Sequence, residues 1–233
     1  MRYPAGDERL FGISVPLGSI KVHGGWRVGE YPDLVPFAGL CKELGARLLQ
    51  LLPLNDTGGQ SSPYSALSAF ALHPLYIRVR DLPEAAAAPG AVEELESFAA
   101  KATSGERFPY GACLDAKLAA LRAVYKASAD SIAADAGLAS FESDRPWLRT
   151  YAVYRRLKSS YGEQAWRSWP DHGRPTRGEI DTLWDDPSAR REQLFHAWMQ
   201  YRAAEQFCAA AEAVAGMGLV LLGDIPILMN DDS

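Results

Sequence analysis

One short stretch, residues 45–53, limits most strongly what this chain can fold into. The run Leu48–Leu52 holds four leucines and one glutamine, with Gly45 upstream and Pro53 closing it. A short, almost continuous apolar run between Gly and Pro is typical of a strand buried on both faces, as strands of parallel sheets are. We therefore expect a buried parallel strand here.

A helix is predicted immediately before this strand. Asp33 stands where an N-cap is needed, and Gly45 stands where a left-handed residue commonly ends a helix. The apolar residues between them recur at helical spacing: Leu34, Phe37, Ala38, Cys41 and Leu44.

A polar loop follows the predicted strand. It covers residues 55–62 and ends in Pro63-Tyr64, and a second apolar run, Leu75–Val79, comes after it. The partial alternation of that run predicts a second strand. A buried strand that delivers a polar, Gly-rich loop with one aromatic side chain is the usual layout of an active-site edge in α/β folds. The loop is therefore the first candidate for a functional site.

Helical patterns dominate from residue 81 to about residue 187. Apolar side chains recur at helical spacing in Leu114–Leu121 and in Trp147–Tyr154. A crossover between parallel strands needs only about a dozen residues, far fewer than this segment contains. We predict an inserted helical subdomain over residues 81–187, preceded by a part with two strands over residues 1–80.

The chain then returns, over residues 188–233, to strand and helix alternation. One long helix is predicted from Arg190 to about Gly216, followed by a buried strand at 219–222. Helices alternating with buried strands imply a parallel sheet with right-handed crossovers. Asp224 follows this strand directly and so lies at its carboxyl end, where barrel active sites are found. The alternative is that Asp224 only caps the following turn.

Composition excludes several classes of function. The 233 residues carry a net charge of −5, which provides no basic surface for nucleic acid or an anionic membrane. The cysteines, Cys41, Cys113 and Cys208, are odd in number and far apart, which argues against a disulfide framework or a zinc site. No run approaches the roughly 20 apolar residues of a membrane span, and residues 1–8 lack the apolar region of a secretion signal. We expect a cytoplasmic protein with no metal or cofactor; its oligomeric state stays open.

Two ordered sets of residues resemble a known family. Leu52-Pro53-Leu54, Ser62-Pro63-Tyr64-Ser65 and Ser68-Ala69-Phe70-Ala71 look like the first signature of amylomaltases, the 4-alpha-glucanotransferases of glycoside hydrolase family 77. Gly223-Asp224-Ile225-Pro226-Ile227, ending with Asp232-Ser233, is similar to the family's signature after its third strand. Three further segments look like landmarks of the family's insertion: Pro109-Tyr110-Gly111, Trp147-Leu148 and Trp166–Pro170.

The resemblance implies a fold. It is the α/β (β/α)8 TIM barrel of the α-amylase clan, of which this chain supplies the N-terminal part: about three strands, an incomplete barrel with an open edge, and the inserted helices. In the family, the nucleophile and the acid/base stand on strands beyond the third. The resemblance therefore places no catalytic residue in this chain. We expect a truncation, an excised piece or the product of a split gene from a longer enzyme.

The resemblance also implies binding residues. Tyr64 is similar to the tyrosine that packs against the sugar beside the scissile bond, and Asp224 to the aspartate that orders the catalytic carboxylates. Asp56, Ser62 and His73 are expected nearby without an assigned role, and Trp26 either fills a surface loop or lines a sugar subsite. The expected ligands are maltose, maltodextrin or other α-1,4-glucans.

Two rival interpretations remain. A catalytically inactive maltodextrin-binding module would use the same Tyr64 and Asp224, and a non-sugar α/β protein with a helical insert would use neither. The tryptophans and tyrosines of the predicted insert could likewise form a glucan-stacking face, but their helical spacing favours a place in the core.

Overall fold

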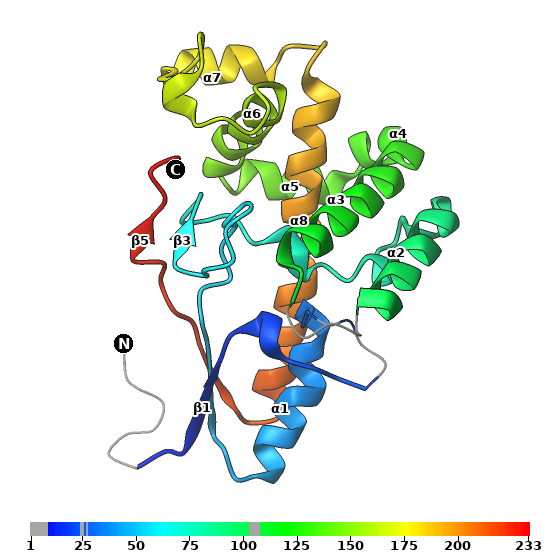
Figure 1. The fold of residues 1–233 in the computed structure, drawn as a ribbon, viewed down its shortest axis with the longest axis vertical. Helices are drawn as coiled ribbons and strands as arrows, with labels where there is room; N and C mark the ends of the chain where they lie inside the picture. Colours follow the sequence, from blue (N-terminus) through cyan, green and yellow to red (C-terminus); the bar gives the residue numbers. More distant parts are fainter. Residues whose placement is uncertain (1–8, 24–25, 27, 103–107) are drawn as a thin grey trace.

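The structure is a computed structural model that describes residues 9–23, 26, 28–102 and 108–233. Residues 1–8, which we interpreted as lacking a secretion signal, lie outside the described residues. At the centre stands a parallel three-stranded sheet in the order β1-β2-β4, formed by Gly12–Val15, Leu48–Leu51 and Val220–Leu222 (Figure 1). Leu48 is aligned with Gly12 on one side and with Val220 on the other. The predicted parallel sheet and its strand at Leu48 are thus confirmed.

One predicted strand is wrong. Residues 75–79 are not a strand: they belong to two short 3-10 helices, η3 (Pro74–Tyr76) and η4 (Val79–Asp81). Pro74 at the first position of η3 and the His73 side chain, which accepts from the Leu75 amide, favour the turn over an extended chain. The remaining strand of the sheet is β1, at residues for which we predicted no strand.

The helices occupy the ranges where helical spacing predicts them. Asp33 precedes the first helix, but its side chain does not cap it; instead it accepts from the Glu30 amide at 2.8 Å. Gly45 has φ of +84°, as its predicted place past the helix end requires. The α-helices are α1 Leu34–Glu43, α2 Pro89–Ala102, α3 Tyr110–Ala127, α4 Ala129–Ala133, α5 Ala136–Ser143, α6 Trp147–Ser160, α7 Arg177–Trp184 and α8 Arg190–Gly216. The other 3-10 helices are η1 Leu17–Ser19, η2 Tyr31–Asp33, η5 Ala85–Ala87 and η6 Trp166–Ser168.

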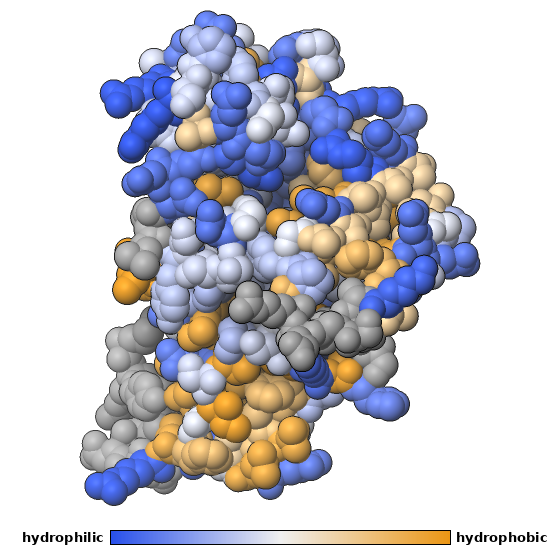
Figure 2. All heavy atoms as spheres, in the orientation of Figure 1, coloured by the Kyte–Doolittle hydropathy of each residue, from blue (hydrophilic) through white to orange (hydrophobic). Residues whose placement is uncertain are grey.

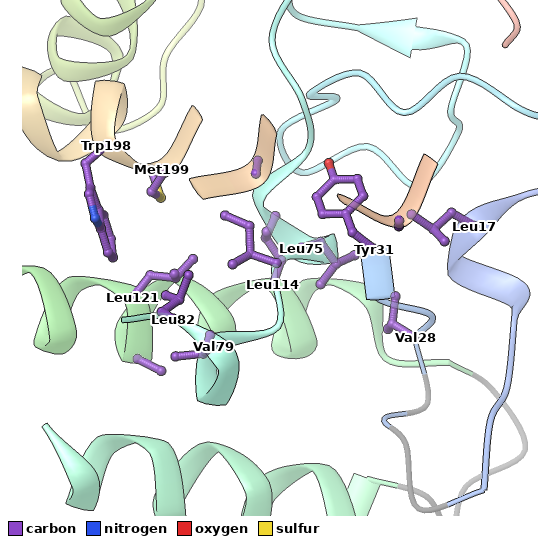
Figure 3. Close-up of a cluster of buried hydrophobic side chains, with 14 of the residues drawn as sticks. Leu17, Val28, Tyr31, Leu75, Val79, Leu82, Leu114, Leu121, Trp198 and Met199 are labelled. Atoms are coloured by element: carbon purple, nitrogen blue, oxygen red, sulfur yellow. The ribbon is translucent and has the colours of Figure 1, made fainter. Parts of the chain in front are cut away.

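Helix α8 runs along the whole molecule and connects its two ends. Its 27 residues extend for about 40 Å. One end packs on α1 and leads into β4, and the other packs on α5 and α6 (Figure 1). The buried side chains form one continuous cluster that crosses from the sheet to the helices. Figure 3 shows part of it, with Tyr31 and Leu75 gathered with Leu114 and Leu121 of α3 and with Trp198 of α8.

The sheet is open at both edges within the described residues, as we expect for an incomplete barrel. Figure 2 shows apolar surface gathered over the end of the molecule that carries the sheet and α1, and polar surface over the end that carries α6 and α7. Large apolar side chains exposed by half or more near this sheet are Phe11, Leu40, Leu44, Ile225 and Ile227. None of the described helices combines the length and apolar composition that a membrane span requires.

A second, two-stranded pairing lies beyond the carboxyl ends of the main strands. β3 (Ser65–Ala66) pairs in parallel with β5 (Leu228–Met229), and the Asn230 amide donates to the Ala66 carbonyl at 3.1 Å. This pairing joins the loop after β2 to the segment after β4 (Figure 1). The two loops that carry the predicted site residues are therefore held side by side.

Candidate functional site

Tyr64 and Asp224, which are 160 positions apart, contact each other directly. The Tyr64 hydroxyl donates to Asp224 Oδ2 at 2.9 Å, and both side chains are half-buried. Each residue lies beyond the carboxyl end of a parallel strand, β2 or β4, where α/β barrels carry their active sites. The hydrogen bond to Asp224 raises the pKa of Tyr64, so the hydroxyl keeps its proton at neutral pH.

Asp224 also serves the turn that follows it. Its Oδ1 accepts from the Ile225 amide at 2.8 Å, which is the capping use considered as the alternative. Asp224 contacts Tyr64 and caps the turn at the same time, because its two carboxylate oxygens have different partners. Oδ2 faces Tyr64, so a polar acceptor, the Asp224 carboxylate, lies next to an apolar surface, the Tyr64 ring.

Ser62 lies in the same loop with its side chain exposed, and its carbonyl accepts from the Ser65 amide at 3.1 Å. This bond closes a tight turn whose inner residues are Pro63 and Tyr64, directly before β3. Ser62 thus lies in the same tight turn as Tyr64. Its contact with a ligand stays a prediction.

Asp56 is placed inside the protein, with 2% of its surface exposed. The Gly58 amide donates to Oδ1 at 2.9 Å, the Tyr151 hydroxyl donates to Oδ2 at 2.7 Å, and the Arg155 guanidinium lies 3.9 Å from Oδ2. Burial alone would raise the pKa of Asp56, but Arg155, His73 and these donors outweigh it and hold the pKa below its usual value. The carboxylate therefore anchors the polar loop to α6 from beneath.

His73 lies next to this anchor, with 2% of its surface exposed. Its Nδ1 accepts from the Leu75 amide at 3.3 Å, so the proton belongs on Nε2, 2.5 Å from the Tyr110 hydroxyl. Tyr110 in turn donates to the Gly58 carbonyl at 3.2 Å. Burial, the largest cause, lowers the pKa of His73 to about 4, against a smaller opposing effect of Asp56. His73 is a neutral support of the loop at physiological pH.

Trp26 is placed in the core, with 4% of its surface exposed. Its ring lies 6.3 Å from that of Phe98 on α2, and the Lys117 ammonium of α3 lies 4.2 Å from its centre. Lys117 is itself fully buried and pairs with Glu30 at 2.5 Å. Trp26 thus packs in the core against α2 and α3, and none of its described contacts is with Tyr64 or Asp224. Its place at a sugar subsite stays a prediction.

Two cavities adjoin the loops of the site. The first, of about 540 Å³, has a mixed polar and apolar lining and lies between residues 57–60 of the loop, Arg155 and Lys158 of α6, and the segment with Asn230 and Asp232. The second, of about 440 Å³, is apolar, and its aromatic lining consists of Phe70, Trp147, Tyr151, Tyr154, Trp166 and Trp169. By contrast, Trp184 and Trp198 are fully buried core residues. Of the aromatic residues that line the cavity, Tyr151 and Trp169 are themselves mostly buried.

Sequence reasoning missed several residues that support the site. Tyr151, Arg155 and Lys158 project from successive turns of α6, and Asp232 meets Lys158 from the far end of the chain. The spacing of these α6 residues places them on one face of the helix, and this spacing in the sequence predicts a polar face. Among the described residues, no group of three His, Cys, Asp or Glu side chains is arranged to hold a metal ion.

Comparison with known proteins places these features in a family. The sequence profile of the family described as 4-alpha-glucanotransferase matches residues 15–233. The 4-alpha-glucanotransferase of Chlamydia pneumoniae is 31% identical over 230 residues, which cover 98% of this chain and 43% of that protein. The 4-alpha-glucanotransferase DPE2 of Oryza sativa subsp. japonica is 31% identical over 229 residues, which cover 95% of this chain and 24% of that protein.

Solved structures show the same fold. The amylomaltase of Streptococcus agalactiae in complex with acarbose superposes with a TM-score of 0.78 at 21% identity, covering 97% of this chain and 45% of that one. The amylomaltase of Corynebacterium glutamicum has a TM-score of 0.71 at 22% identity, covering 94% of this chain and 30% of that one. The chain has the fold of part of these proteins and spans less than half the length of the relatives named here.

Proposed function

The chain belongs to the 4-alpha-glucanotransferase family, glycoside hydrolase family 77, and on that premise we propose that it supplies sugar-binding residues of an enzyme that transfers α-1,4-glucan segments between maltodextrins. The ligands in this proposal are maltose, maltodextrin and other α-1,4-glucans, and the place of action is the cytoplasm. The acarbose bound by the amylomaltase of Streptococcus agalactiae supports a ligand of this class.

The observation that carries the proposal is the Tyr64–Asp224 contact at 2.9 Å. Glucose presents C–H groups on its faces and hydroxyls around its edge, so it binds well where an aromatic ring adjoins an acceptor that is already oriented. The hydroxyl of Tyr64 fixes one oxygen of Asp224, and the Ile225 amide fixes the other. A carboxylate oxygen has more than one lone pair, so Oδ2 can accept from a sugar hydroxyl while it retains Tyr64.

The chemistry in this proposal is a retaining double displacement. One carboxylate attacks the anomeric carbon while a second protonates the leaving oxygen, and a sugar hydroxyl then displaces the covalent intermediate. We assign neither reacting carboxylate to residues 1–233. Asp56 is unsuited to either role, because its oxygens already have Gly58, Tyr151 and Arg155 as partners. The role of Tyr64 and Asp224 is to orient the sugar beside the scissile bond.

Incubation of the protein with maltotriose, followed by chromatography, tests the transferase activity. A ladder of shorter and longer maltodextrins that forms without a nucleotide sugar is the expected result for the enzyme that contains this chain. The 233 residues alone should bind maltotriose without turnover, which is also what an inactive maltodextrin-binding module would do. Hydrolysis to glucose alone would remove the transferase assignment, and turnover by the 233 residues would place a reacting carboxylate among them.

Calorimetric titration with acarbose tests the proposed residues. Tyr64→Phe keeps the ring and removes the hydroxyl, whereas Tyr64→Ala removes both, so affinity should fall in that order. Asp224→Asn should weaken binding as well. Asp130→Asn is the matched control, because Asp130 is 93% exposed on the far helices and pairs only with Arg191 in the described part of the chain. If Tyr64→Phe, Tyr64→Ala and Asp224→Asn all bound acarbose as tightly as the control Asp130→Asn, the proposed site would be refuted.

A further inference from the structure

We propose that Asp232 and Lys158 are positioning residues that hold the Tyr64–Asp224 pair in place from the inserted helices. The inference rests on the proposed function in one respect, namely that the pair binds glucan. It assigns to the helices of residues 81–187 a part in glucan binding, exerted through contacts and not by touching the sugar.

Asp232 joins the segment after β4 to the helical part through three contacts, and a fourth holds it within its own segment. Its Oδ2 accepts from the Lys158 ammonium, its Oδ1 accepts from the Trp166 amide at 2.8 Å, and its carbonyl accepts from the Tyr154 hydroxyl at 2.6 Å. Its own amide donates to Asn230 Oδ1 at 3.0 Å. Backbone and side chain are therefore both fixed.

Lys158 is positioned for this purpose. Besides Asp232, its ammonium donates to the Glu163 carbonyl at 3.0 Å and to the Gln164 carbonyl at 3.3 Å, so all three N–H groups have partners. Its side chain is 7% exposed. It also lies in the last turn of α6, where a cation is favoured by the helix dipole. The ammonium thus ties the end of α6, the turn after it and Asp232 together.

The contacts reach Tyr64 and Asp224 through the β3–β5 pairing. Leu228, four positions after Asp224, pairs with Ser65, which directly follows Tyr64. Asp232 then fixes the other end of β5 to α6 and η6. Loss of the anchor leaves β5 held by one short ladder, so β5 and the turn with Asp224 can shift relative to Tyr64. A displacement of about 1 Å in a site can cost roughly a hundredfold in its function.

The test uses the whole chain labelled at the tyrosine ring carbon that carries the hydroxyl, with Tyr64 followed by NMR as pH rises. In the wild type, Tyr64 should titrate above its usual pKa of about 10, and Asp224→Asn defines the value without the contact. Asp232→Asn, the isosteric and milder change, and Lys158→Met should both move the pKa of Tyr64 toward its value in Asp224→Asn. Both should also weaken maltotriose binding at least about tenfold. If Lys158→Met does not fold, Asp232→Asn decides.

Lys117→Met is the matched control. Lys117 is also a buried lysine of the helical part with one carboxylate and one carbonyl partner, but its partners are Glu30 and Ile77. It should lower stability and leave the Tyr64 titration unchanged. An unchanged Tyr64 titration in Asp232→Asn, with stability lowered as in Lys117→Met, would overturn the positioning role. If the wild type binds no maltotriose, the proposed function fails, whereas the Tyr64 titration still decides whether Asp232 and Lys158 position the pair.

Discussion

Replacing His73 with Asn should change how the stability of the protein depends on pH. His73 is buried against Asp56, Arg155 and Tyr110, and its pKa is lowered from 6.5 to about 4. Because the folded pKa lies below the unfolded one, the unfolded chain binds more protons between these two values. The wild type should therefore lose stability as pH falls from about 6.5 toward 4.

The size of the effect follows from the two pKa values. At pH 5 an unfolded histidine is almost fully protonated, while the folded one is about nine-tenths neutral, and the linkage relation gives a loss of about 2 kcal/mol between pH 7 and pH 5. Asn at position 73 cannot titrate, but it can still accept from the Leu75 amide that His73 Nδ1 now binds. Whatever the substitution costs in packing is the same at both pH values.

Urea unfolding followed by tryptophan fluorescence, at pH 7 and pH 5, measures this difference. His196 is also buried with a lowered pKa, but it is present in both proteins and cancels in the comparison. The wild type should lose about 2 kcal/mol more than His73→Asn between the two pH values. Parallel losses in the two proteins would refute a buried, neutral His73. His23→Asn, at an exposed position, is the control and should follow the wild type.

Other substitutions test the placement of the remaining residues. Asp56→Ala should lower the free energy of unfolding by about 3–5 kcal/mol, because it removes the buried carboxylate that faces Arg155 and accepts from Tyr151 and the Gly58 amide; a loss below about 1 kcal/mol would contradict the anchor. Trp26→Ala should lower the free energy of unfolding by about 3–5 kcal/mol, as for a core aromatic. Tyr64→Ala should leave the melting temperature nearly unchanged and weaken glucan binding. The reverse pattern would place Tyr64 in the core and Trp26 at the glucan site. Gly58→Ala should destabilise by more than about 1 kcal/mol, because φ is +57° and a Cβ would meet a leucine side chain at 2.6 Å. Gly59→Ala, with open space around it, should be close to neutral.

The central strand of the sheet was predictable from its apolar run. Leu48–Leu51 is apolar enough to be recognised, although only the face with Leu49 and Leu51 is fully buried and Leu48 and Gln50 on the other face are half-buried. β1 is short and alternates between exposed and half-buried residues at the edge of the sheet, so its sequence carries a weaker signal. Leu75–Val79 is as apolar as a strand, but its side chains fill the core from 3-10 turns. Apolar composition alone does not distinguish these two outcomes.

The candidate site was predictable only in part. The resemblance singled out Tyr64 and Asp224, and the structure adds that they contact each other. The burial of Asp56 and His73 depends on Tyr110, Tyr151 and Arg155, which lie far along the chain and reach the loop only through the packing of α3 and α6. A polar residue in a Gly-rich loop looks the same in sequence whether it faces a ligand or anchors the loop from beneath.

The central claim is that Tyr64 and Asp224 bind an α-1,4-glucan together, and the NMR signal of the Tyr64 ring during a maltotriose titration tests it most directly. The signal should shift with increasing maltotriose until it saturates, and Asp224→Asn should require at least about tenfold more sugar, as expected when one hydrogen bond to a charged group is lost. A Tyr64 signal that stays unchanged while maltotriose saturates another part of the chain would contradict the claim.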